Sequence, residues 1–224
     1  MNGAREGTAM RVLVFVLSVM MLFSVIAPAQ ALDYGEIKLP PPQTDGGMPL
    51  MRALKQRQSQ REFSTKELSL QTLSDLLWAA AGVNRPDTGG RTAPTAMDRQ
   101  EIDIYVAVKD GLFLYDAKAH ALLPVLPVDI RAVTGDQAFV KDAPVNLIFV
   151  ADHRKMEGMT GEQKDFYAAT DTGYISENVY LFCASAGLST VVRGWINKLT
   201  LTKAMKLRPS QTIILAQTVG YPHN

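Results

Sequence analysis

Several residue types are scarce in this 224-residue chain, and each scarcity excludes a class of protein. Cys183 is the single cysteine, so no disulfide can form within the chain. The three histidines are scattered, without the spacing of a metal site. No basic block stands out, and 23 Lys and Arg balance 22 Asp and Glu. We therefore expect neither a metal centre nor a nucleic-acid partner.

Apolar residues, in contrast, are abundant. They make up 47% of the chain and charged residues 20%, a composition typical of a folded domain rather than a disordered one. The length suits one domain with a substantial core. Cys183 falls in an apolar stretch, "NVYLFCASAGL", which favours a buried packing residue over a reactive thiol.

The N-terminus predicts export. Arg5 and Arg11 precede an apolar run over residues 12–27, and "PAQA" follows, with Ala29 and Ala31 at the positions of a small-x-small cleavage site. We interpret residues 1–31 as a signal peptide cut after Ala31, which places the mature protein in the periplasm or outside the cell. The alternative is an uncleaved membrane anchor, but the run is shorter than the roughly 20 residues that span a bilayer. No stable membrane span is expected after cleavage.

Residues 32–48 hold three consecutive prolines and a glycine pair, which indicates a linker or arm before a domain at 49–224. Within the domain the apolar periodicity alternates between helical and strand patterns. It predicts helices near 49–56, 69–82, 163–186 and 199–207, and strands near 102–108, 112–116, 145–151, 189–192 and 211–220. This order predicts an α+β or α/β domain around a mixed sheet.

The longest predicted helix, over 163–186, has mainly apolar candidates for its inward face. These are Phe166, Tyr167, Tyr174, Val179, Phe182 and Ala186. Asp171 and Glu177 interrupt the apolar pattern, so we expect both on an exposed or dimer-facing side.

The segment "RQSQREF" places Arg57, Ser59 and Arg61 at alternate positions. In an extended chain such side chains share one face. Two guanidiniums and a hydroxyl suit a phosphorylated, redox-active ligand, because arginine matches phosphate oxygens and can face a ring that becomes anionic on reduction. The alternative is a solvated charged segment.

Four segments together resemble the nitroreductase-like flavoproteins. "RQSQREF" matches their R-x-S-x-R-x-F motif, and "APTAMDRQ", before a strand, is similar to their "PSAMNRQPW" loop. "GLFLYDAKAHALLPVL" and "DTGYISENVYLFCASAGLSTVV" look like the branch that contains the SagB-type thiazoline and oxazoline dehydrogenases. The similarity extends over residues 49–222.

This resemblance implies an FMN-binding α+β fold with a mainly antiparallel central sheet, paired into a homodimer with the flavin at the subunit boundary. It implies hydride transfer between a small-molecule donor and a small-molecule acceptor in alternating half-reactions, with no particular residue as acid or base. Arg57 and Ser59 would contact the phosphate and ribityl end, and Arg61 the flavin ring edge. The remaining implied contacts are Pro94, Thr95, Ala96 and Asp98 in the loop beside the ring, and Gly187, Leu188 and Ser189 in the turn behind it.

Three departures from the family pattern raise a second hypothesis. Asp98 stands where nitroreductases commonly have Asn, and it cannot donate a hydrogen bond when ionised. Glu101 replaces the usual proline, so we expect a less rigid loop. The sequence given stops at "GYPHN", where many relatives continue with basic phosphate contacts; Arg193 could substitute for these, or could be a surface arginine. The second hypothesis is a degenerate nitroreductase fold that binds a small ligand or peptide without redox turnover.

Overall fold

The computed structural model describes residues 35–223. The predicted signal peptide at 1–31 and the first residues of the predicted arm lie outside this range. Among the residues that are described, no helix combines the length and the apolar character that a bilayer crossing needs.

The centre of the fold is a seven-stranded sheet in the order β1-β6-β5-β4-β7-β9-β8, and every neighbouring pair in it is antiparallel. Its strands are β1 (Ile37–Lys38), β4 (Ile102–Val108), β5 (Gly111–Asp116), β6 (Ala121–Leu126), β7 (Val145–Asp152), β8 (Ser189–Arg193) and β9 (Gln211–Gly220). A separate hairpin pairs β2 (Val83–Arg85) with β3 (Gly90–Arg91). The predicted α+β architecture with a mainly antiparallel sheet is confirmed.

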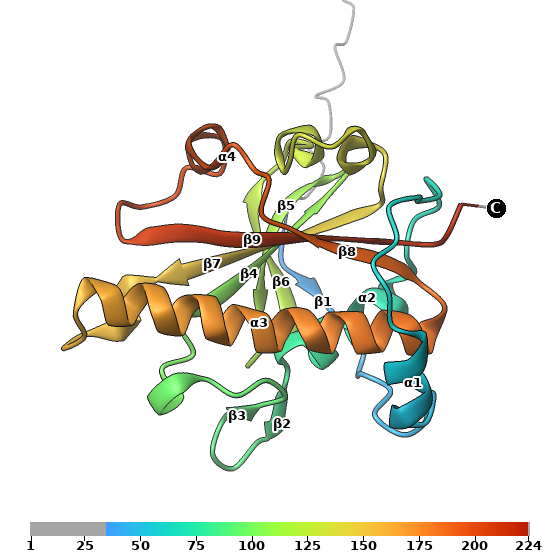
Figure 1. Ribbon diagram of the computed structural model, residues 1–224, viewed down its shortest axis with the longest axis horizontal. Coiled ribbons are helices and arrows are strands. Elements are labelled where there is room, and N and C mark those ends of the chain that lie inside the picture. Colours follow the sequence, from blue (N-terminus) through green and yellow to red (C-terminus); the bar gives the residue numbers. More distant parts are fainter. Residues whose placement is uncertain (1–34, 224) are drawn as a thin grey trace, which may run out of the picture. The chain divides into compact units, whose positions relative to one another are not determined.

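β7 is the central strand that its continuous apolar sequence predicts, and all eight of its residues are buried. Successive side chains on a strand point to opposite faces. Accordingly, Leu147 and Phe149 belong to one core cluster, while Ile148 and Val150 belong to another. The sheet is therefore covered on both faces, by α2 and α3 on one side and α4 on the other (Figure 1).

The α-helices are α1 (Leu50–Gln56), α2 (Leu70–Ala81), α3 (Gly161–Ala186) and α4 (Lys198–Ala204), all close to their predicted positions. Short 3-10 helices are η1 (Ala96–Asp98), η2 (Arg131–Val133), η3 (Ala138–Lys141) and η4 (His153–Met156). α2 begins where the Ser69 side chain accepts from the Thr72 amide, and α3 ends at Gly187 in a left-handed conformation. Serine and glycine thus set these ends as the sequence predicts.

The predicted inward face of α3 is right at Val179 and Phe182, which pack in or against the core, and wrong at Phe166, Tyr174 and Ala186, which are exposed. Phe166 is 63% exposed and Tyr174 is 47% exposed, whereas Asp171, expected outside, is only 3% exposed. Glu177 is exposed, as predicted. The inner stripe instead carries small and polar residues such as Ala168, Thr172 and Ser176, which let the helix lie close to the sheet but give no apolar period in the sequence.

β6 was not predicted as a strand, because Pro124 lies inside it. Proline lacks an amide hydrogen and is tolerated at a sheet edge. β1 pairs only with Ala121 and Leu122, so Pro124 needs no partner on that side.

The segment before α1 lies along α2 and the end of α3. The Ser74 hydroxyl donates to the Pro40 carbonyl at 2.6 Å, and the Met48 amide donates to the Ser185 hydroxyl at 2.7 Å. This region is therefore bound to the helices that carry the candidate site.

Candidate functional site

The segment that follows α1 runs along β8, the last strand of the sheet. The Gln60 amide donates to the Thr190 carbonyl at 2.9 Å, and the Ser64 amide donates to the Tyr221 carbonyl at 2.9 Å. Phe63 and Pro222 form an isolated β-bridge. These contacts place Arg57, Ser59 and Arg61 beside the start of β8 and the end of β9.

Tyr180 of α3 joins this segment to the sheet. Its hydroxyl lies 2.7 Å from the Ser59 hydroxyl and accepts from the Val192 amide at 2.9 Å. The guanidinium carbon of Arg57 lies 5.4 Å from the centroid of the Tyr180 ring, a cation–π contact. Arg57 and Ser59 thus reach the same side chain. Tyr180 belongs to no motif in the sequence, and its one signal is its place two helical turns before Gly187.

A cavity of about 410 Å³ opens between this segment and the end of α3. Its lining residues are Lys55, Gln56, Arg57, Gln58, Gln60, Cys183, Ala184, Gly187, Leu188 and Pro222. The cavity brings two cations, Lys55 and Arg57, to the glycine turn that follows α3. A volume in this range suits a small-molecule ligand.

The turn itself leaves room for a ligand. Gly187 has a φ of +68°, and a Cβ placed there would meet no atom within 4 Å. The hydroxyl of Ser189 is buried without a hydrogen-bond partner. Two cations and an open glycine backbone line the cavity and fit a phosphorylated cofactor such as FMN, while the Ser189 hydroxyl lies buried next to this turn and outside the cavity lining.

Arg61 is exposed and does not line this cavity. Its implied contact with the flavin ring edge therefore stays a prediction. Cys183 is fully buried beside the cavity, as its apolar surroundings predict, and burial raises the pKa of its thiol.

The loop that contains Pro94, Thr95, Ala96 and Asp98 is strained. Met97, Asp98 and Gln100 all have positive φ angles, of 52°, 51° and 48°. Residues other than glycine rarely adopt this conformation, and they keep it only where the surrounding structure holds them. Pro94 and Asp98 are exposed at its surface, where the Asp98 carboxylate accepts from the Gln100 side chain at 3.0 Å.

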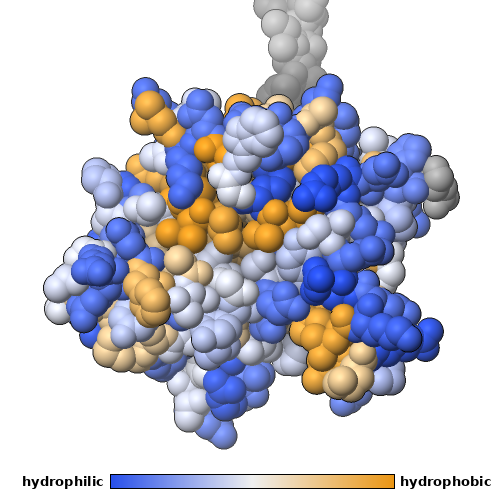
Figure 2. Space-filling view, viewed as in Figure 1, coloured by the Kyte–Doolittle hydropathy of each residue, from blue (hydrophilic) through white to orange (hydrophobic). Residues whose placement is uncertain are grey.

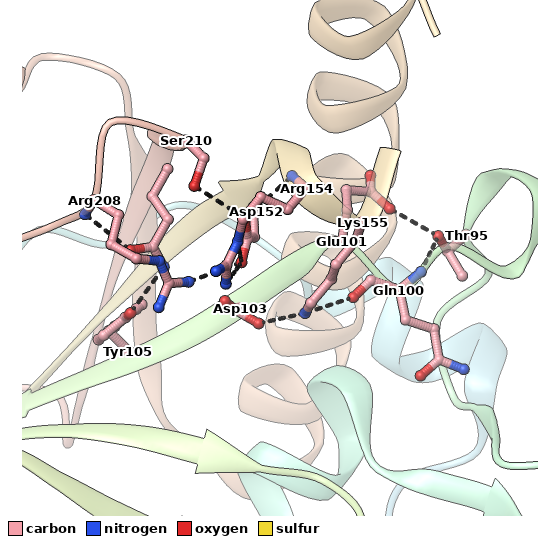
Figure 3. A network of polar contacts seen from close by, with 11 residues as sticks. Thr95, Gln100, Glu101, Asp103, Tyr105, Asp152, Arg154, Lys155, Arg208 and Ser210 are labelled. Carbon is pink, nitrogen blue, oxygen red and sulfur yellow. Dashed lines mark hydrogen bonds and ion pairs between the residues drawn. The ribbon is translucent and has the colours of Figure 1, made fainter. Parts of the chain in front are cut away.

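Side chains from two elements hold this loop. The Ala96 amide donates to Asp171 of α3 at 2.8 Å. The Gln100 amide donates to the Thr95 hydroxyl at 3.0 Å, and that hydroxyl donates to Glu101 at 3.0 Å (Figure 3). Glu101 lacks the ring that gives the family's proline its rigidity, but its carboxylate anchors the loop by hydrogen bonding instead.

The loop and the cavity lie far apart within one chain. Gly187 follows Asp171 by 16 residues on the same helix. At a rise of about 1.5 Å per residue this separation is about 24 Å. Figure 1 shows α3 crossing the whole molecule, with α1 at the end where the cavity opens. The residues implied by the family resemblance therefore divide into two separate groups.

Arg193 belongs to neither group. It is 4% exposed, and its guanidinium donates to the Thr134 carbonyl, the Asn146 side chain and the Thr218 hydroxyl at 2.8 to 3.0 Å. Burial lowers the pKa of Arg193 to about 10. The surface-arginine alternative is wrong, because the side chain is inside the fold and each of its nitrogens has a protein acceptor.

A charged network closes the end of β7 next to the loop (Figure 3). Asp152 accepts from Arg154 and Arg208, each at 2.8 Å. The hydrogen bonds from Arg154 lower the pKa of Asp152 to about 2. Lys155 donates to the Gln100 carbonyl at 3.1 Å and to Asp103 at 2.7 Å, so this network also ties down the loop's last residues.

Comparisons with known proteins point to one family. A sequence model of the nitroreductase family matches residues 54–221. A protein of Methanocaldococcus jannaschii named as a candidate nitroreductase is 28% identical over an alignment of 193 residues that covers 82% of this chain and 96% of that protein.

Two solved structures of candidate nitroreductases are similar to this chain. The crystal structure of a candidate nitroreductase from Ralstonia eutropha JMP134 has a TM-score of 0.81 and 46% identity, covering 84% of this chain and 90% of that one. A candidate nitroreductase from Desulfovibrio desulfuricans, solved in complex with FMN, has a TM-score of 0.58 and 21% identity, covering 80% and 89% of the two chains.

Proposed function

We propose, because this chain belongs to the nitroreductase family, that it is an FMN-dependent oxidoreductase with a site built from two copies of the chain. FMN, when bound, supplies two-electron hydride transfer from a small-molecule donor to a small-molecule acceptor in alternating half-reactions. The observation that carries the proposal is the cavity in which Arg57 and Lys55 face the Gly187 turn. The FMN complex of the Desulfovibrio desulfuricans relative supports it.

The residues around the cavity have distinct roles in this proposal. Arg57 and Lys55 neutralise the phosphate, and stacking on Tyr180 orients the Arg57 guanidinium. The Ser59 hydroxyl, fixed by Tyr180, contacts the ribityl chain. The turn at Gly187, Leu188 and Ser189 lies behind the ring, and its backbone is open at Gly187. Arg61 stabilises negative charge on the ring edge.

The length of α3 supports the proposed homodimer. About 24 Å separate the loop at Asp171 from the turn at Gly187, and pairing of two copies would bring the loop of one to the cavity of the other. Exposed apolar residues are available for pairing: Leu50 and Met51 on α1 are 62% and 76% exposed. Figure 2 shows a further apolar band along β8 and β9, between α3 and α4.

Two narrower proposals concern substrate and location. The quoted middle segments favour the SagB-type branch, which points to azoline rings in a peptide as electron donor. The N-terminal pattern favours export after cleavage at Ala31. Turnover of a synthetic thiazoline peptide tests the proposed substrate. N-terminal sequencing of the protein recovered from the cell envelope tests export and cleavage after Ala31.

Titration of flavin-free protein with FMN tests the main proposal. We expect saturable binding, bleaching by dithionite, and affinity reduced about ten-fold or more in Arg57→Ala or Arg61→Ala, because each removes about 1.5 to 3 kcal/mol of charge-assisted bonding. Arg52→Ala is the matched control, since Arg52 is exposed on α1 outside the cavity.

Protein that binds no FMN would contradict the proposal and favour a degenerate fold that binds another small ligand or peptide. Sedimentation tests the dimer directly. A monomer that binds FMN with full affinity would overturn the two-copy site.

A further inference from the structure

Glu101 is a fully buried carboxyl group at the end of the strained loop. Its relative exposure is 0%, and one oxygen, Oε2, accepts from the Thr95 hydroxyl at 3.0 Å. The other oxygen, Oε1, is buried without a hydrogen-bond donor. A buried ionised oxygen with no donor is strongly unfavourable. The charge on Glu101 Oε1 must therefore be removed or offset by a neighbouring group.

Asp171 supplies that explanation. It is itself 3% exposed and holds the Ala96 amide through Oδ2. Burial raises the pKa of Glu101, and the neighbouring negative charge of Asp171 raises it further. A proton on Glu101 Oε1 removes the unfavourable charge and provides a donor to the Asp171 carboxylate. The two carboxyl groups thus share one proton.

Other charged groups around the pair make no contact with Oε1. The groups from neighbouring elements are Arg91 of β3, Asp98 of η1, Asp103 of β4 and Lys155 of η4. Lys155 is engaged by Asp103 and the Gln100 carbonyl, and Asp98 is exposed. Arg91 lines a small hollow together with Asp171 and Thr95, but donates nothing to Glu101. Asp171 is the charged neighbour that acts on Glu101 both through its negative charge and as a side-chain hydrogen-bond partner.

We propose that Glu101 and Asp171 form a carboxylic acid–carboxylate pair that positions the loop at residues 94–98 for contact with the cofactor of a second copy. This inference rests on the proposed function. Each member of the pair holds one side of the loop, Glu101 through Thr95 and Asp171 through Ala96. Loss of the shared proton sets two negative charges against each other and frees a loop that three left-handed residues already strain.

The direction of the pH effect follows from proton binding. In the folded protein the pair holds its proton more tightly than Glu101 does in the unfolded chain, so folding is favoured at low pH and this stabilisation is lost as pH rises through the folded pKa. Loop order, and with it FMN affinity, therefore falls with increasing pH. Glu101 and Asp171 are positioning residues, because they act through the loop rather than on the cofactor.

Glu101→Gln tests the pair, since the amide keeps the size and the donor but cannot ionise. FMN affinity and the thermal stability of flavin-free protein are measured from about pH 5 to about pH 9. We expect wild-type affinity to fall about ten-fold over this range while Glu101→Gln stays flat at the wild-type low-pH value. Glu101→Ala, which lacks the donor, loses affinity at every pH. Glu177→Gln, at an exposed position of the helix that carries Asp171, keeps the wild-type profile.

A wild-type profile that Glu101→Gln reproduces at every pH overturns the proposal. If the protein binds no FMN at any pH, the proposed function fails, while the stability difference between wild type and Glu101→Gln still decides whether the pair exists. If Glu101→Gln does not fold, Asp171→Asn replaces it, because the introduced amide can donate to an ionised Glu101 and should also flatten both profiles.

Discussion

The hydroxyl of Ser59 lies 2.7 Å from that of Tyr180, which fixes the R-x-S-x-R segment to α3 across 121 positions of sequence. The same tyrosine oxygen accepts from the Val192 amide, at the edge of the sheet. One phenol therefore connects the R-x-S-x-R segment, α3 and β8. Removal of the Tyr180 hydroxyl should therefore weaken ligand binding, although no sequence motif contains Tyr180.

Tyr180→Phe should weaken FMN binding several-fold and destabilise the fold by about 1 to 2 kcal/mol, because the Ser59 hydroxyl and the Val192 amide lose their partner. Flavin titration and chemical denaturation measure the two effects. Tyr174→Phe, half-exposed on the same helix, serves as control and should change neither. Equal behaviour of the two variants would remove Tyr180 from the site.

Gly187→Ala separates backbone strain from ligand contact. Alanine in the left-handed conformation costs about 1 to 2 kcal/mol, which thermal denaturation of flavin-free protein would detect. The added methyl meets no protein atom, and the backbone strain is the same with and without FMN. A loss of FMN affinity in Gly187→Ala would therefore report a ligand at the turn. Gly173→Ala, inside α3, should instead raise stability by up to about 1 kcal/mol. Undiminished flavin affinity in Gly187→Ala would place the ring elsewhere.

Arg193→Ala should destabilise the fold by about 2 to 4 kcal/mol, since it leaves the Thr134 carbonyl without its buried donor and removes one of the two donors to the Asn146 side chain. Flavin affinity of the folded fraction should remain unchanged. Urea denaturation and FMN titration of the same sample measure both quantities. A ten-fold loss of affinity would restore Arg193 as a phosphate contact.

Asp152→Asn should lower stability at neutral pH by about 2 kcal/mol, because it removes the carboxylate that Arg154 and Arg208 hold. The folded pKa of Asp152 is depressed to about 2, so its stabilisation is complete above the unfolded pKa and is lost as pH falls from about 4 toward about 2. The difference between wild type and Asp152→Asn should vanish over that interval. Asp142→Asn, at an exposed position, should show no such pH dependence.

The sequence predicted most of the fold because its main elements carry local signals. Ser69 and Gly82 bound α2, and β7 has the continuous apolar run of a strand buried on both faces. The inward face of α3 could not be predicted in the same way, since small and polar residues pack against the sheet while Phe166 points to solvent. Periodicity detects a face only where the buried residues are apolar.

The candidate site was predictable as far as sequence motifs reach. The motif indicated Arg57 and Ser59, but the contact of both with Tyr180 depends on a helix more than a hundred residues away. Likewise, the sequence marked Glu101 only as a missing proline, and Asp171 as a surface residue. Their proximity arises from tertiary packing between β4 and α3, which a single sequence does not encode locally.

The length of α3 has a genetic consequence under the proposed pairing. A copy with a defective loop and a copy with a defective cavity would assemble into a mixed dimer with one intact site and one doubly defective site. Co-expression of Arg57→Ala with Glu101→Ala should therefore recover up to half of the wild-type flavin content per mixed dimer, although neither variant alone retains it. Complementation between two alleles of one gene is therefore expected, because α3 separates the loop and the cavity so that each site takes one from each copy.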